Sequence, residues 1–102
     1  MLTVKDRRRL ATCIRHWARL ATGTEGEDES IGVKDCALCV VHYHHGMCKG
    51  CPVYKDTGKT KCQGTPYNGV VRAANKYGFA SKQFRCKAVS MLEYLIRLDQ
   101  RL

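Results

Sequence analysis

Apolar residues near the start of the chain recur at the spacing of one helical face. Thr3 is a candidate N-cap with Asp6 three residues later, and Gly23 stands where a left-handed C-cap is favoured. The apolar face consists of Leu10, Cys13, Ile14, Trp17 and Ala21. The pattern predicts a basic amphipathic helix over residues 1–23, with Cys13 and Trp17 in the core.

A second helical stripe occupies the end of the chain. Ser81 is the candidate N-cap of a C-terminal helix over residues 81–102. Its apolar positions are Phe84, Ala88, Met91, Leu92, Leu95, Leu98 and Leu102. Before it, Thr65 and Pro66 have the chemistry of a helix start, which predicts a short helix over residues 67–78.

Residues 24–66, between the first helix and the short helix, have no helical period. Residues 24–32 are rich in glycine and acid, which predicts a loop. Residues 39–43 alternate weakly, as a short strand does, and the sequence KDTGK at residues 55–59 is typical of a tight turn. We therefore expect residues 33–66 to form a cysteine-rich metal lobe built on a small irregular hairpin.

Together these elements predict a single α+β domain over residues 1–102 that is mostly helical. Its N- and C-terminal helices pack together, with the metal-stabilised hairpin lobe and the short helix between them. A domain of this length buries only about two thirds of the surface that its unfolded chain exposes, so its core is small. A structural metal would add stability that such a core lacks.

Five of the seven cysteines lie within residues 35–67, and their spacing indicates a metal site. Two C-x-x-C pairs precede a fifth cysteine, and thiols separated by two residues can bind one tetrahedral ion. Clustered cysteines in a reducing compartment are more often ligands than disulfides, and an odd number leaves one thiol unpaired. The candidate ligands are four of the five residues Cys36, Cys39, Cys48, Cys51 and Cys62.

The ligand set and the metal each have two interpretations. The ligands are either the two C-x-x-C pairs, whose spacer of eight residues is short, or a set in which Cys62 replaces Cys48. Zn²⁺ is the predicted metal because four thiolates close its tetrahedral shell, and an iron–sulfur cluster is the alternative. Cys13 and Cys86 lie in helical patterns away from the cluster and are expected to be small buried hydrophobes.

His42, His44 and His45 are candidate ligands or general bases, on a segment expected to be partly exposed. A catalytic zinc also needs a carboxylate to move protons, and the acids within residues 35–67 are Asp35 and Asp56. Neither a zincin motif nor a deaminase signature occurs. We therefore expect no enzyme, with a metal-dependent nuclease that uses one of the three histidines as base kept as a third interpretation.

The net charge of +9 indicates an anionic partner. Four of the nine acidic residues lie within residues 25–29, so 18 basic residues face only five acidic ones elsewhere. The basic face of the first helix offers the candidate contacts Lys5, Arg8, Arg9, Arg15 and Arg19. Nucleic acid is the usual partner of such a face, and an acidic protein surface is the alternative. No stretch approaches the ~18 apolar residues of a membrane span, so no membrane partner is expected.

The run from Cys36 to Tyr67 contains C-x-L-C, then C-x-G-C-P-V, then T-G-x-x-x-C-x-G-T-P-Y. This pattern resembles short cysteine-rich proteins encoded by tailed bacteriophages and prophages, most of them without assigned function. The resemblance implies a phage origin and action in the cytoplasm of the infected bacterial host cell, and it implies no mechanism. It is carried by Cys36, Leu38, Cys39, Cys48, Gly50, Cys51, Pro52, Val53, Thr57, Gly58, Cys62, Gly64, Thr65, Pro66 and Tyr67.

Charge, cysteines and resemblance together predict a small phage-encoded zinc-binding accessory protein that binds nucleic acid through a basic helical face. The alternative is a protein-binding inhibitor or modulator of a host machine, such as a polymerase or a defence nuclease complex. The first function predicts an affinity for nucleic acid that falls steeply with salt. Recovery of one stoichiometric host protein from nuclease-treated lysate would favour the second.

Overall fold

The computed structural model describes residues 3–26, 29–32, 35–42, 50–59 and 62–101. Its helices are α1 (Val4–Thr22), α2 (Ala37–His42), α3 (Pro52–Thr57), α4 (Tyr67–Tyr77) and α5 (Lys82–Arg101). The described residues contain no strand, so the expected α+β class is wrong and the fold over these residues is helical. No helix in this part of the chain is long and apolar enough to cross a membrane.

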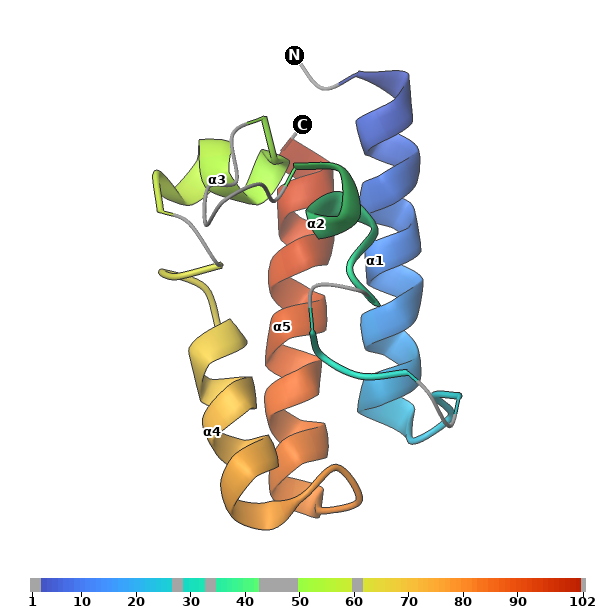
Figure 1. Cartoon of the computed structure of the whole chain (residues 1–102), viewed down its shortest axis with the longest axis vertical. Coiled ribbons are helices and arrows are strands. Elements are labelled where there is room, and N and C mark those ends of the chain that lie inside the picture. Colours follow the sequence, from blue (N-terminus) through green and yellow to red (C-terminus); the bar gives the residue numbers. More distant parts are fainter. Residues whose placement is uncertain (1–2, 27–28, 33–34, 43–49, 60–61, 102) are drawn as a thin grey trace.

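The three long helices lie side by side, as Figure 1 shows. Helices α1 and α5 run antiparallel, and α4 packs along the other side of α5. The short helices α2 and α3 lie toward the C-terminal end of α5, with α2 against α1. The prediction that the N- and C-terminal helices pack together is therefore confirmed.

The ends of the long helices follow the local chemistry of the sequence. Thr3 Oγ1 accepts a hydrogen bond from the Asp6 amide at 3.0 Å, and Ser81 Oγ accepts one from the Phe84 amide at 3.1 Å. Each bond satisfies one of the amides that the first turn of a helix leaves without a partner. Gly23 ends α1 with φ at 78°, a left-handed conformation that glycine adopts without steric cost.

The core lies between α1, α4 and α5. Its fully buried side chains include Leu10 and Leu20 of α1, Val70 of α4, and Phe84 and Leu95 of α5. Burial of each large apolar side chain contributes about 1.5–3 kcal/mol before the loss of conformational entropy. The apolar stripes of the first and last helices thus supply the core, as their spacing predicts.

The expected hairpin lobe is wrong, because its proposed strand and turn belong to helices. Residues 39–42 lie in α2, and Lys55 lies in α3, which Gly58 ends with φ at 71°. Two local features favour these helices. The Cys39 amide donates to Cys36 Sγ at 3.3 Å at the start of α2, and proline at the first position of α3 has a backbone angle already suited to a helix. Tyr43 lies outside the described residues.

Candidate functional site

A cavity of about 260 Å³ lies between α1, α5 and the segments that carry the cysteines. Side chains from α1, from residues 31–39, from the start of α3 and from residues 62–67 line it. The lining includes five cysteines, which are Cys13, Cys36, Cys39, Cys51 and Cys62. It contains no lysine or arginine, so the described residues bring no permanent positive charge to these sulfurs.

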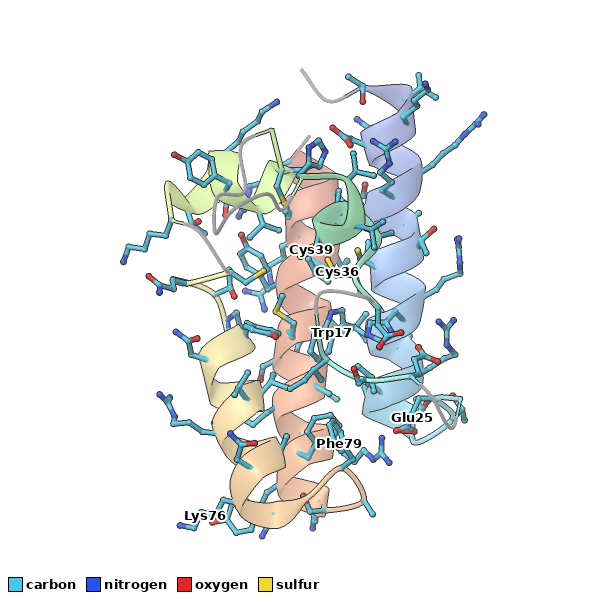
Figure 2. All side chains as sticks on the ribbon, in the orientation of Figure 1. Trp17, Glu25, Cys36, Cys39, Lys76 and Phe79 are labelled. Atoms are coloured by element: carbon cyan, nitrogen blue, oxygen red, sulfur yellow. The ribbon has the colours of Figure 1, made fainter. Side chains whose placement is uncertain are left out.

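Four of the five predicted metal ligands therefore lie on one cavity. Cys36 directly precedes α2, and Cys39 stands in the first turn of that helix. Cys51 is the N-cap residue of α3 and is buried. Cys48, the fifth candidate, lies outside the described residues, as do His44 and His45. Figure 2 shows Cys36 and Cys39 close together between α1 and α5.

Cys62 reaches the cavity from an unusual backbone conformation. Its φ is 58°, in the left-handed region that residues other than glycine avoid at a cost of about 1–2 kcal/mol. Thr65 stabilises this turn, because its hydroxyl donates to the Cys62 carbonyl at 2.6 Å and accepts from the Tyr67 amide at 3.1 Å. The C-x-G-T-P-Y sequence is thus a turn that directs Cys62 toward the other thiols and begins α4.

Cys13 is the cavity residue that the sequence did not place near the cluster. It is 3% exposed, and its Sγ lies 3.9 Å from Cys36 Sγ although 23 residues separate the two. The helical period correctly predicted that Cys13 is buried. Its neighbour across the interface depends on how the cysteine segment folds back on α1, and no local pattern carries that information. Cys86, by contrast, is exposed, so its expected burial is wrong.

The thiols change each other's acidity. Hydrogen bonding from Cys13 and Cys39 lowers the pKa of Cys36. Hydrogen bonding to Cys36 raises the pKa of Cys13, and contacts with Cys36 and Cys62 raise the pKa of Cys39. The contact with Cys39 lowers the pKa of Cys62, while burial raises the pKa of Cys51 to about 11. The pKa values of Cys36 and Cys62 are thus shifted down, next to Cys13 and Cys39, whose pKa values are shifted up.

The described residues do not form a finished metal site or a disulfide. No group of three or more Cys, His, Asp or Glu side chains among them is arranged to hold a metal ion. Each of the six described cysteines is free. Cys48, which one of the two predicted ligand sets requires, is not among these residues. Zn²⁺ therefore stays a prediction that rests on the donor chemistry.

His16 lines the same cavity from α1, and a carboxylate orients its ring. Its Nδ1 is hydrogen-bonded to Glu29 of the acidic loop. Arg19 also contacts Glu29, with 2.9 Å between Nη2 and Oε2, and its hydrogen bond lowers the pKa of Glu29 to about 2. The sequence contains a signal for His16, because His16 follows Cys13 by three residues and therefore lies on the same face of the helix.

His42, a candidate ligand or base, does not line this cavity. Its Nε2 lies 2.7 Å from Asp6 Oδ1, and Arg9 donates to the same oxygen at 2.8 Å. Burial opposes ionisation of Asp6, but His42 and Arg9 outweigh it and lower the pKa of Asp6. The three side chains thus connect α1 to the end of α2. This arrangement accounts for a buried aspartate in the first turn of α1.

The five predicted basic contacts fall into two groups. Arg9 and Arg19 are held by Asp6 and Glu29, so their charges are partly neutralised. Lys5, Arg8 and Arg15 are exposed, and none of them forms an ion pair with a described carboxylate. We call Lys5, Arg8 and Arg15 the basic face of α1. Because successive residues turn by about 100°, Arg8 and Arg15 lie roughly opposite Cys13 on the helix.

Helix α1 therefore has two chemically different sides, with cysteine and histidine on the cavity side and cations without a described carboxylate partner on the solvent side. The acidic loop contacts it at Arg19, and Glu25 of that loop is paired with Arg85 of α5. No protein-family model, curated protein or solved structure matches the chain.

Proposed function

We propose that the protein binds nucleic acid through the basic face of α1, while a Zn²⁺ ion held by its cysteines orders the segment behind that helix. The proposed ligands are Cys36 and Cys39, with two more from Cys48, Cys51 and Cys62. The resemblance of this segment to phage proteins supports a role as a phage-encoded accessory protein in the host cytoplasm. The structural and binding roles would thus lie on opposite sides of one helix.

One observation carries the binding role, namely that Lys5, Arg8 and Arg15 project from one helix without a described carboxylate partner. Ten residues separate the first and last of these cations, which corresponds to about 15 Å along the helix. Such a row matches the repeated negative charges of a phosphate backbone, where each contact releases a bound counterion. Cations already paired with Asp6 or Glu29 would gain less from the same phosphates.

The zinc role is supported by the chemistry of the cavity. Thiolates are the ligands that structural zinc prefers, and four described candidates line one cavity without lysine or arginine. Bound metal would supply the positive charge that these sulfurs lack. Metal analysis of the protein purified under reducing conditions should find about one zinc ion per chain, if four thiolates close one shell.

The binding experiment compares two double variants with the same change of charge. Arg8→Glu with Arg15→Glu reverses two cations of the basic face, and Arg72→Glu with Lys76→Glu reverses two exposed cations on one side of α4. Fluorescence anisotropy with labelled single- and double-stranded DNA and RNA, at salt from about 50 to about 200 mM, measures both affinity and its salt slope. Loss of two phosphate contacts should lower the slope by about two in the first variant and leave it near the wild-type value in the second.

Absent or salt-insensitive binding to every DNA and RNA probe would contradict this function. An acidic protein surface would then be the partner to test, by capture from nuclease-treated host lysate. Plasmid cleavage that a chelator stops would instead indicate the metal-dependent nuclease. Equal losses of affinity in the two double variants would show that binding depends on net charge and does not depend on which helix carries the cations.

A further inference from the structure

Cys13 brings a sulfur atom from α1 to the thiols of the cysteine segment, residues 36–62. The Cys13 side chain lies one helical turn before Trp17, on the side of α1 that faces the cavity. Its side-chain partner is another sulfur, Cys36 Sγ at 3.9 Å, and the Ala37 and Leu38 backbone also contacts it. A cysteine that only filled space would be surrounded by hydrocarbon, as small buried hydrophobes usually are. Cys13 instead meets the first residue of a C-x-x-C pair.

The separation of the two sulfurs fits a shared metal ion. Zinc binds each sulfur at about 2.3 Å, so two ligands of a regular tetrahedron lie about 3.8 Å apart. The observed distance of 3.9 Å needs no movement of α1 or of the helix that follows Cys36. In a four-iron cluster, inorganic sulfide lies between the irons and the cysteine sulfurs stand farther apart. The distance therefore favours a single ion.

One further contact holds Cys36 in place for this role, and Cys62 lies on the same cavity. The Cys39 amide donates to Cys36 Sγ at 3.3 Å, and hydrogen bonds of this kind orient ligands and stabilise their negative charge. Cys62, from its left-handed backbone, also lines the cavity. Sulfurs from α1, from the Cys36–Cys39 pair and from the residue 62–65 turn thus line one cavity. No three of them are arranged around a common point in the described residues, so a bound ion would have to draw them together.

We infer that Cys13 is a ligand of the metal ion, together with Cys36, Cys39 and Cys62, so that the metal joins α1 to the cysteine segment. The inference rests on the zinc-binding part of the proposed function and is independent of nucleic-acid binding. In this ligand set Cys13, from α1, takes the place of one or more of the ligands predicted from the cysteine segment. The ion then crosslinks the helix that carries the basic face to the segment packed behind it.

Cobalt substitution tests the ligand count. Co²⁺ takes zinc sites, and the intensity of its thiolate-to-metal absorption reports how many sulfurs are bound. With one of four thiolates lost, Cys13→Ser should lower the intensity per bound ion by about a quarter, as Cys36→Ser should. Cys86→Ser is the matched control, because Cys86 is exposed and does not line the cavity. Its spectrum should equal that of the wild type.

Affinity alone would not decide the question, since loss of a group that only contacts a ligand also costs about 10–100-fold in metal affinity. An unchanged intensity per ion in Cys13→Ser, even with weaker binding, would show that Cys13 is a hydrogen-bonding neighbour and would overturn the inference.

The wild-type chain provides a test that does not depend on a variant folding. In the protein loaded with ¹¹³Cd²⁺, scalar coupling between the metal and the β protons of each ligand cysteine identifies the ligands directly. The expected result is a correlation to Cys13 in addition to the cysteines of the segment. Correlations to other cysteines without Cys13 would overturn the inference alone. No binding of Zn²⁺, Co²⁺ or Cd²⁺ to the wild type would overturn the zinc role and this inference together.

Discussion

Glu29 shows how a single residue fastens the acidic loop to α1. Its carboxylate is 14% exposed and contacts both His16 and Arg19, which come from adjacent turns of the helix. A charged group so placed contributes to stability only while it is ionised. The lowered pKa of Glu29 should therefore make the stability of the fold depend on pH.

Replacing Glu29 by Gln should remove part of the loss of stability in acid. Because the folded pKa lies at about 2, below the ordinary value of 4.5, ionised Glu29 stabilises the fold above about pH 4.5 and loses this effect as pH falls toward 2. Between about pH 5 and about pH 3, the free energy of unfolding should fall by on the order of 1–2 kcal/mol more in the wild type than in Glu29→Gln.

Urea unfolding at several pH values measures this difference, with Glu93→Gln as the matched control. Glu93 is 56% exposed and faces Arg97 at 3.6 Å on the surface of α5, so its loss should leave the pH dependence of the wild type unchanged. Parallel curves for the wild type and Glu29→Gln would show that the contacts of Glu29 with Arg19 and His16 do not stabilise the fold.

The ends of α1 and α5 are the features whose positions were predicted most accurately from the sequence. Thr3, Gly23 and Ser81 stand where their side chains or backbone angles satisfy the ends of α1 and α5, and these signals are local. Ser81 is suited to a quantitative test because α5 contains a second serine in its interior. Ser90 is exposed and has only a long contact of 3.4 Å to the Cys86 carbonyl.

Ser81→Ala should destabilise the protein by about 1 kcal/mol, because the Phe84 amide loses its hydrogen-bond acceptor at a buried position. Ser90→Ala should change stability by less than about 0.5 kcal/mol, since it removes the same atom from an exposed site. Thermal unfolding of both variants against the wild type measures the two effects. Equal stability of Ser81→Ala and Ser90→Ala would mean that the cap contributes nothing.

The short helices show where sequence patterns failed and why. The alternation in residues 39–43 favoured a strand, but a strand needs a partner and none is present in the described residues. Helices of six residues such as α2 and α3 are not stable alone, and their period is too short to recognise. Contacts with α1 and α5 decide their conformation. The cysteine spacing thus predicted four of the residues that line the cavity, while the place of Cys13 beside them, and with it that of His16 on the same helical face, required the tertiary fold.

At the scale of the whole molecule, most of the helical residues lie outside the cysteine segment. Helices α1, α4 and α5 contain 19, 11 and 20 residues and share the apolar core, whereas α2 and α3 contain six residues each. A proposed metal bound at the cavity would stabilise the segment through linkage, by an amount that grows with metal affinity and concentration.

Removing the metal with a chelator should therefore lower the melting temperature but leave most of the far-ultraviolet circular dichroism at low temperature. This outcome differs from that of zinc fingers, which unfold without metal because they lack a sufficient core. Circular dichroism with and without chelator, followed by readdition of Zn²⁺, measures both quantities. Complete loss of helical signal would show that α1 and α5 do not fold together without the metal, and an unchanged melting temperature would argue against a structural metal.

The exposure of Cys86 has a practical consequence. The other described cysteines line the cavity, so among these six a maleimide dye should react first at Cys86 on the surface of α5. A fluorophore there would stand away from the basic face of α1 and would leave its three cations unmodified. Among the described cysteines, Cys86 thus offers a natural attachment point for following encounters with a partner by fluorescence.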